Sequence, residues 1–288
     1  MNRHGLLILL VVTLAAGNAQ SQDAKPNPLA QADVKKNLVY GTHERNKLDL
    51  AVPKGDGPFP LIVWIHGGGW EGGNKDGFGP LAGQLTRGYA IASINYRYSR
   101  HAPFPAQIID SKAAIRYLRT QAKEYKLDAD HFGVCGASAG GHLSALLGTS
   151  NGVAGLDEKN AKPDECRVQA VVDFFGPADL MKLSPPGSKE NAVTRLLGGN
   201  TREKGELAKI GSPQTHADKT DPPMLLVHGD VDKLVPLSQS EDLLTAVKAA
   251  GIECDLIVVK GVGHDAGVFK KETVERVNEF WDKHLKKK

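Results

Sequence analysis

Residues 136–140 read Gly-Ala-Ser-Ala-Gly, and this pattern places Ser138 where a serine could act as a nucleophile. The pentapeptide directly follows a short apolar run and directly precedes small and apolar residues that suit a helix. At such a strand–turn–helix junction the hydroxyl is exposed near the helix N-terminus, where partial positive charge favours an anion. Glycine is needed on both sides because side chains there would collide with neighbouring backbone in so tight a turn. The alternative is a helix start of small residues without chemistry.

A second glycine-rich segment, residues 66–70, reads His-Gly-Gly-Gly-Trp and follows an earlier apolar run. Three consecutive glycines leave backbone N–H groups open to a ligand, and such donors stabilise a negatively charged oxygen during acyl transfer. We therefore expect Gly68 and Gly69, together with the N–H of Ala139, to form an oxyanion hole. The alternative is a flexible loop. We expect His66 to hold the loop by hydrogen bonding and not to react.

A serine hydroxyl is a poor nucleophile until a base takes its proton. Among the ten histidines of the chain, His264 is placed best, in the glycine-rich loop GVGHDAG after the last apolar run. The acid that orients the imidazole is expected after the apolar run 224–228, because the chain order serine, acid, histidine is typical of this arrangement. Asp230 and Asp232 are both candidates. Asp232 lies further into the loop, toward His264, whereas Asp230 lies nearer the strand and can instead cap the loop.

Three other titratable residues close to these motifs have simpler interpretations. His142 follows Ser138 by four residues on the same expected helix and should point away from the triad. His228 ends an apolar run and is expected to pack. Asp265 adjoins His264, and adjacent residues rarely orient each other's side chains in the way that a triad requires.

The reactive segments follow short apolar runs rich in Val and Ile, which are typical of buried parallel strands. These runs cover residues 61–66, 89–95, 131–136, 169–175, 224–228 and 254–260. Apolar residues recur at helical spacing over residues 106–125, 138–148, 238–250 and 269–285. Strands that alternate with helices predict an α/β fold with a mostly parallel central sheet and helices on both faces. The more alternating segments 37–40 and 47–52 are expected to form antiparallel edge strands.

The chain of 288 residues suits a single domain, which we place over residues 37–288. Residues 1–19 are interpreted as a signal peptide with cleavage near Ala19, since their apolar stretch is too short to span a bilayer; a retained membrane anchor is the alternative. Residues 20–36 are polar and are expected to form a loose arm. Residues 176–221 lack a clear strand, so we expect a small lid-like insert there, with a plain surface excursion as the alternative.

The composition, with 41% hydrophobic and 24% charged residues, is ordinary for a globular enzyme. The net charge of +3 comes from scattered basic residues, so no nucleic acid partner is expected. No further stretch is apolar enough for stable membrane insertion, and the sequence makes no prediction of oligomeric state. Cys135 is expected to be a small buried residue, and a disulfide between Cys166 and Cys254 is left open.

Four ordered motifs together resemble the α/β-hydrolase superfamily: HGGGW, GASAGGH, GDVDKLVP and GVGH. The chain is similar in particular to hormone-sensitive-lipase-like carboxylesterases and to bifunctional feruloyl and acetyl xylan esterases, which also carry segments like NYRYS and FPAQIIDSKAAIRYLR (residues 95–99 and 104–119). The resemblance spans about residues 48–285. It implies Ser138, Asp232 and His264 as the triad and the HGGG loop with Ala139 as the oxyanion hole. Because residues 20–45 are too short and polar for the helical N-terminal cap of the lipase-like group, the xylan-esterase-like group is favoured.

The expected function is that of a secreted or periplasmic serine carboxylic ester hydrolase that forms an acyl-enzyme and needs no cofactor or metal. Its expected substrates are short-chain acyl esters, small molecules or acetyl and feruloyl esters linked to plant polysaccharide. Trp70 is expected to form an apolar wall for the acyl group, with simple packing as the alternative. One competing hypothesis is a prolyl-oligopeptidase-like serine peptidase, although such enzymes carry an N-terminal propeller. Another is a non-catalytic binding module on a hydrolase fold.

Overall fold

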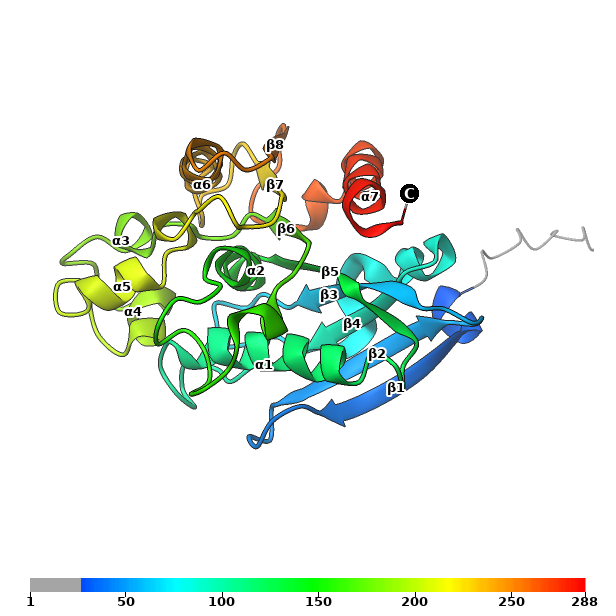
Figure 1. The fold of residues 1–288 in the computed structure, drawn as a ribbon. Helices are drawn as coiled ribbons and strands as arrows, with labels where there is room; N and C mark the ends of the chain where they lie inside the picture. The colour runs from blue at the N-terminus through cyan, green and yellow to red at the C-terminus, as the bar shows by residue number, and fades with distance from the viewer. Residues whose placement is uncertain (1–26, 288) are drawn as a thin grey trace, which may run out of the picture.

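An eight-stranded sheet forms the centre of the protein (Figure 1). The computed structural model describes residues 27–287. The strands are β1 Ala32–Val39, β2 Lys47–Pro53, β3 Phe59–Ile65, β4 Ala90–Ile94, β5 Leu127–Ala137, β6 Ala170–Phe174, β7 Met224–Gly229 and β8 Cys254–Val259. Their order across the sheet is β1-β2-β4-β3-β5-β6-β7-β8. β2 pairs antiparallel with β1 and with β4, and the other pairings are parallel.

The sheet confirms the predicted α/β fold. Each of the six apolar runs forms a parallel strand, and the two alternating segments form the antiparallel edge. Every residue of β4, β6 and β7 is buried, because helices cover the sheet on both faces. The reactive motifs follow β3, β5, β7 and β8, so parallel pairing brings them to the same edge of the sheet.

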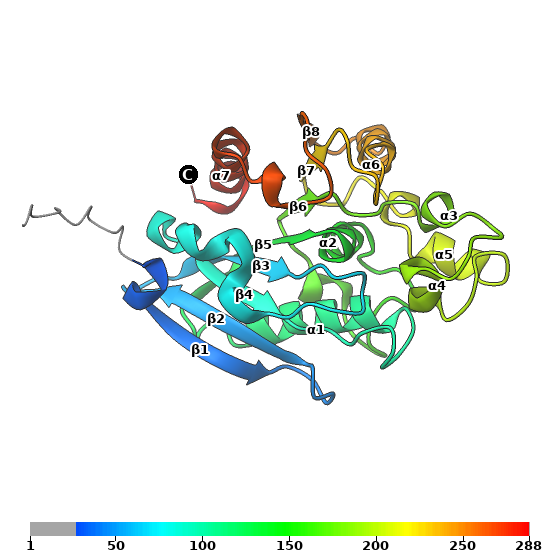
Figure 2. The ribbon, with the colours of Figure 1, turned by 180° about the vertical axis from the view of Figure 1, so that it is seen from behind.

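Helices cover the two faces of the sheet in two groups (Figures 1 and 2). α1 Ala106–Thr120, α2 Ala139–Thr149 and α6 Ser238–Ala249 contribute to one apolar core. The 3-10 segment η2 Asp76–Arg87 and the C-terminal helix α7 Lys271–Leu285 contribute to a second core on the opposite face. The ends of these four long α-helices lie within two residues of the predicted ends, except that α1 stops five residues before the predicted end at residue 125.

α7 closes the second core with a regular stripe of side chains. Its buried residues recur at every fourth position: Thr273, Val277, Trp281 and Leu285. The Trp281 ring is 0% exposed and packs directly on β5, where a Cβ at Gly133 would lie 2.6 Å from the ring. The glycine in this strand is therefore matched to the tryptophan, and neither has room to change alone.

Short helices occupy the connection between β6 and β7, within the predicted insert 176–221. They are α3 Leu180–Leu183, α4 Ala192–Leu197, α5 Gly205–Ile210 and the 3-10 turn η4 Pro213–Thr215. They lie together beyond one end of the sheet (Figures 1 and 2). Several of their side chains belong to the first core, namely Leu180, Val193, Leu196, Leu197 and Ala208. The insert is thus packed onto the domain, and its action as a lid stays a prediction.

The ordered chain begins earlier than the sequence indicates. Within the arm expected over residues 20–36, the 3-10 turn η1 Pro28–Gln31 precedes β1, which starts at Ala32 and pairs with Pro53 of β2. The expectation of a loose arm was wrong for this part because β1 is an edge strand in which no residue is fully buried, so its sequence lacks an apolar run. Residues 20–26 and the signal peptide expected over residues 1–19 lie outside the described residues.

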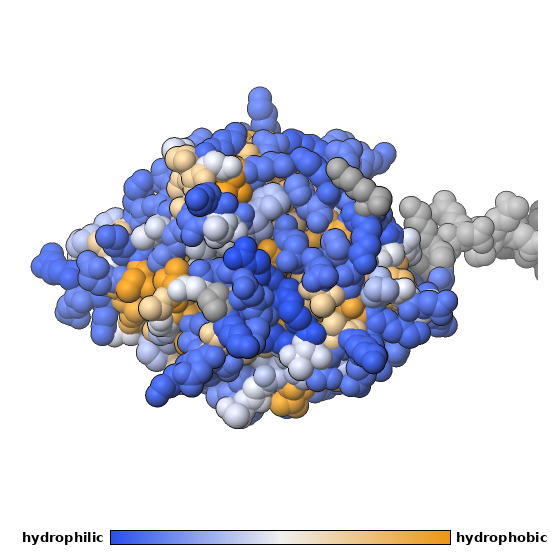
Figure 3. Space-filling model, viewed as in Figure 1, coloured by the Kyte–Doolittle hydropathy of each residue, from blue (hydrophilic) through white to orange (hydrophobic). Residues whose placement is uncertain are grey.

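Within residues 27–287, no helix has both the length and the apolar character needed to cross a bilayer. On the face shown in Figure 3, hydrophilic residues dominate and hydrophobic ones gather in small separate patches. Cys135, Cys166 and Cys254 are buried thiols, so the disulfide that the sequence left open is not formed.

The packing of α7 predicts a large loss of stability when its central ring is removed. Trp281→Ala should lower the free energy of unfolding by about 3–5 kcal/mol, because truncating a buried aromatic side chain leaves a cavity. Glu279→Ala, on the exposed side of the same helix, should change it by no more than about 0.5 kcal/mol. Urea unfolding of the two variants measures both values, and equal shifts would contradict this description of the second core.

Candidate active site

Ser138 lies in a sharp turn between β5 and α2. Its backbone has φ 55° and ψ −121°, a conformation that L-residues rarely adopt. A Cβ at Gly136 would lie 2.5 Å from the carbonyl oxygen of Ile65, and a Cβ at Gly140 would overlap the same oxygen. The two glycines of the pentapeptide are therefore required by the close approach of β3, which is the collision that the sequence predicts. The turn leaves the Ser138 side chain partly exposed at the strand end.

The structure brings the three predicted triad residues together. His264 Nε2 lies 2.8 Å from Ser138 Oγ, and His264 Nδ1 lies 2.6 Å from Asp232 Oδ2. An ionised carboxylate only accepts hydrogen bonds, so it selects the tautomer with the proton on Nδ1 and leaves Nε2 free to accept from the serine hydroxyl. The side chain of Asp232 is fully buried, and its Oδ1 accepts the backbone N–H groups of Leu234 and Val235 at 2.8 and 2.9 Å.

The two competing carboxylates are engaged elsewhere. Asp230 is exposed and its Oδ1 accepts the backbone N–H of Gly261 at 2.7 Å, which holds the two neighbouring loops together. Asp265 caps a short 3-10 turn by accepting the N–H of Gly267 at 2.7 Å. Of the acids on these loops, only Asp232 contacts His264 among the described residues.

A second histidine lies under the acid. His228 is buried and forms hydrogen bonds through both ring nitrogens, with Ser240 Oγ at 2.7 Å and with the Val235 carbonyl at 2.8 Å. Burial lowers its pKa. Its Nε2 is also 3.4 Å from Asp232 Oδ2, so this ring helps to hold the loop that carries Asp232. The expectation that His228 packs is confirmed.

Phe175 is a neighbour of the imidazole that the sequence analysis missed. It follows β6 directly, and its ring meets the His264 ring edge to face, with centroids 4.7 Å apart and an interplanar angle of 67°. Phe175 is 5% exposed, so its ring is a fixed wall against one side of the imidazole. Its place at the carboxyl end of a buried strand is the signal that could have found it.

The HGGGW loop lies directly against Ser138. Gly68, Gly69 and Trp70 all have positive φ, at 109°, 58° and 59°. A Cβ at Gly67 would lie 3.4 Å from the Cβ of Ser138, so no side chain separates the two segments. Gly68 accepts the N–H groups of the two residues that follow Trp70 and so closes the turn.

A cavity of about 300 Å³ opens at the hydroxyl of Ser138. Its walls come from the HGGGW loop, the turn at Ser138, the insert between β6 and β7, and the loop that carries Asp232. The lining consists of Gly69, Trp70, Ser138, Ala139, Pro177, Leu183, Asn191, Ala192, Val193, Leu234 and Val235. Gly69 and Ala139 thus lie with Ser138 at one cavity, whereas Gly68 is not part of its lining. Most of the other walls are apolar, and Leu234 at the rim is 66% exposed.

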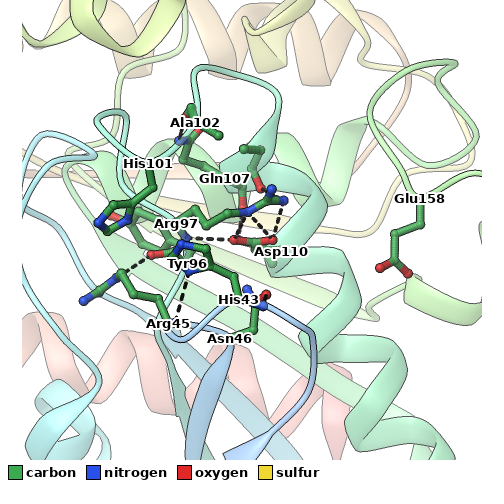
Figure 4. Close-up of polar contacts among 12 residues, drawn as sticks. His43, Arg45, Asn46, Tyr96, Arg97, His101, Ala102, Gln107, Asp110 and Glu158 are labelled. Atoms are coloured by element: carbon green, nitrogen blue, oxygen red, sulfur yellow. Dashed lines mark hydrogen bonds and ion pairs between the residues drawn. The ribbon is translucent and has the colours of Figure 1, made fainter.

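A network of hydrogen bonds joins the segment NYRYS, residues 95–99, to the HGGGW loop. In Figure 4, Arg97 forms two-pronged contacts with Asp110, the shortest at 2.7 Å, and Arg45 donates to the Tyr96 carbonyl at 2.8 Å. The Tyr96 hydroxyl donates to the His66 carbonyl at 3.0 Å. Burial lowers the pKa of His66 to about 4, so this ring is neutral, and its Nδ1 contacts the Gly67 carbonyl at 2.8 Å. His66 therefore has the structural role that the sequence analysis expected.

No group of three or more His, Cys, Asp or Glu side chains in the described part of the chain is arranged to hold a metal ion. The arrangement at Ser138 offers a hydroxyl, a base that can take its proton and backbone donors at a cavity, which together suit acyl transfer.

Comparisons with known proteins identify the family of this chain. The family model BD-FAE matches residues 48–247. Esterase LipC of Mycobacterium tuberculosis is 27% identical over 238 residues, covering 80% of this chain and 59% of LipC. The probable carboxylic ester hydrolase LipM of the same organism is 32% identical over 222 residues, covering 73% and 51%. The chain thus spans between half and three fifths of the length of these relatives.

Solved structures are similar over a larger share of their length. A truncated carbohydrate esterase from gut microbiota has a TM-score of 0.80 and 33% identity, covering 88% of this chain and 97% of that one. An acetyl ester-xyloside bifunctional hydrolase from Caldicellulosiruptor lactoaceticus has a TM-score of 0.69 and 27% identity, covering 82% and 88%. The chain therefore belongs to the BD-FAE family and has the α/β-hydrolase fold of these esterases.

Proposed function

We propose that this chain is a serine carboxylic ester hydrolase with Ser138, His264 and Asp232 as its catalytic triad. The observation that carries the proposal is the unbroken series of hydrogen bonds from Asp232 through His264 to Ser138, which ends at a cavity with backbone donors. The names of similar proteins, an esterase and a carboxylic ester hydrolase among them, support the same class of reaction.

In the first half of the reaction, Ser138 Oγ attacks the carbonyl carbon of the ester while His264 Nε2 takes its proton. The carbonyl oxygen becomes an anion, and the bond to the alcohol then breaks as the imidazolium returns its proton to the leaving oxygen. Asp232 holds the imidazole in the required tautomer and stabilises the imidazolium without being protonated itself. The product of this half is an ester between the acyl group and Ser138.

In the second half, His264 takes a proton from a water molecule, whose oxygen attacks the acyl carbon. The intermediate collapses, the proton returns to Ser138 Oγ and the carboxylic acid is released. These steps need a hydroxyl, an imidazole and a carboxylate in series, so the proposal invokes no cofactor.

The backbone donors for the anionic oxygen are the N–H groups of Gly69 and Ala139. Ala139 is the first residue of α2, so its N–H has no acceptor within the helix and lies at the positive end of the helix dipole. Gly69 lines the same cavity. We assign Gly68, the third expected donor, to the turn that aims Gly69, because its own position is outside the cavity lining.

The cavity supports short acyl esters as substrates. Its volume of about 300 Å³ is at the small end for a ligand site, and its apolar walls suit an acyl group beside the polar reaction centre. Trp70 lines it and fits the proposed role as one of these walls. Acetyl or feruloyl esters of plant polysaccharide are the proposed natural substrates, supported by the carbohydrate esterase and the acetyl ester-xyloside hydrolase among the similar structures.

The proposed place of action is outside the cytoplasm, in the periplasm or secreted. The pattern of residues 1–19, a weakly positive start followed by an apolar stretch and small residues, supports export with cleavage near Ala19.

Ser138→Ala should abolish esterase activity, lowering kcat by roughly 10⁶-fold, because the nucleophile is lost. Hydrolysis of p-nitrophenyl acetate, butyrate and octanoate, with acetyl-xylan and methyl ferulate, measures both the loss and the preferred acyl length. Activity of the variant equal to that of the wild type, with both proteins folded by circular dichroism, would refute the proposed function.

The two aspartates of one loop provide a matched test of the acid. Asp232→Asn should lower kcat by about 10⁴-fold, because the amide no longer selects the productive imidazole tautomer. Asp230→Asn should leave kcat within about twofold of the wild type, since this side chain only joins two loops. Steady-state kinetics on p-nitrophenyl acetate compares them, and the opposite order would assign the acid to Asp230.

Activity should fall as the pH is lowered from 8 to 5, because a protonated imidazole cannot accept the serine proton. The pH profile of kcat/KM for p-nitrophenyl acetate measures the fall. A flat profile over this range would contradict His264 as the base.

A further inference from the structure

Trp70 has a backbone conformation that must be held in place by its surroundings. Its φ of 59° lies in the left-handed region, which is unfavourable for a bulky residue without an external constraint. It directly follows Gly68 and Gly69, which also have positive φ, so the N–H of Gly69 is aimed by a run of three such residues. Two hydrogen bonds fix Trp70: its carbonyl accepts the N–H of Ser99 at 2.9 Å, and its indole N–H donates to His142 Nδ1 at 3.2 Å.

The contact with His142 is buried and directional. Trp70 is 2% exposed and His142 is 0% exposed. Their rings meet edge to face with centroids 5.2 Å apart and an interplanar angle of 88°. The indole nitrogen only donates hydrogen bonds, so His142 Nδ1 must be unprotonated and the ring proton must lie on Nε2. That nitrogen contacts the Gly211 carbonyl of the insert at 2.7 Å, which completes a series of hydrogen bonds across three segments.

His142 is rigidly linked to the nucleophile. It lies one turn into α2, and its backbone N–H donates to the Ser138 carbonyl at 2.9 Å as the first hydrogen bond of that helix. Burial lowers the pKa of His142 to about 4, so the neutral tautomer required by Trp70 is kept at the pH values where an imidazole base works. The side chain has no contact with His264 or Asp232 among its hydrogen bonds, so it is not a second base.

We propose that His142 is a positioning residue, which fixes Trp70 and thereby sets the Gly69 N–H and one cavity wall relative to Ser138. The inference rests on the proposed function and deepens it. One helical turn carries both the nucleophile and the anchor of the loop that stabilises the anion. A small movement of the loop relative to the hydroxyl would weaken the hydrogen bond to the developing anion, and a misplacement of about 1 Å can cost on the order of 10²-fold in rate.

The test compares substitutions of His142 that keep or remove its two hydrogen-bonding groups, the acceptor for Trp70 and the donor to Gly211. His142→Asn keeps an acceptor near the position of Nδ1 for Trp70, whereas His142→Gln extends past it toward Gly211. His142→Leu removes both groups. With p-nitrophenyl acetate, we expect kcat to fall by about 10–100-fold for His142→Leu and His142→Gln, with little change in KM, and to stay within about fivefold of the wild type for His142→Asn.

Trp70→Phe is the complementary variant, since it keeps a six-membered aromatic ring in the cavity wall and removes the part of the indole whose N–H donates to His142. It should lower kcat to a similar extent, and the double variant Trp70→Phe/His142→Leu should be no slower than the slower single variant, because both remove the same contact. Thermal unfolding identifies variants that fail to fold. If the His142 variants do not fold, Trp70→Phe, which keeps an aromatic ring at this position, provides the decisive measurement.

The outcomes separate this inference from the proposed function. If Ser138→Ala is inactive but Trp70→Phe and His142→Gln keep the wild-type kcat, the positioning role is overturned and the proposed function stands. Losses in the double variant that multiply would equally overturn it, because they would show two independent effects. If Ser138→Ala retains full activity, the proposed function itself fails.

Discussion

The close approach of β3 to the turn after β5 is the constraint on which the site depends. The Ile65 carbonyl occupies the space where side chains at Gly136 and Gly140 would begin, so the end of β3 packs on the turn with nothing between them. The HGGGW loop leaves β3 at this point and Ser138 leaves β5 beside it. The proposed nucleophile and the proposed anion donors are thus positioned by one backbone contact, which tolerates little change because interiors are closely packed.

That the candidate site residues lie together could be predicted because each follows a strand whose sequence is locally recognisable. Parallel strands end at one edge of the sheet, so motifs far apart in the chain converge there once the strand order is right. Asp232 and His264 follow the neighbouring strands β7 and β8, which explains their contact. The choice between Asp230 and Asp232 depended on the family resemblance, since side-chain direction in a loop is not encoded in a pattern of residue types.

The features that the sequence analysis missed depend on contacts between distant segments. Trp70 and His142 are 72 residues apart, and their hydrogen bond requires a particular loop conformation and rotamer. Phe175 lies at a strand end, where a site residue can be expected, but its contact with the His264 ring depends on a backbone φ of 46°, which the residue types alone do not encode. The helices of the insert are short and capped by polar side chains such as Asn191, so their sequence resembles a loop until tertiary packing supplies the buried face.

The polar character of β1, which made it resemble a loose arm, has a consequence for the whole sheet. β1 is one of two open edges, and it carries Lys35 and Lys36 beside a register irregularity between Lys35 and Leu38, where Asn37 has φ 58°. Charged side chains and bulges on an outer strand discourage a strand of another molecule from extending the ladder. Lys35, Lys36 and Asn37 make β1 hard to recognise as a strand in the sequence, and they also disfavour edge-to-edge aggregation.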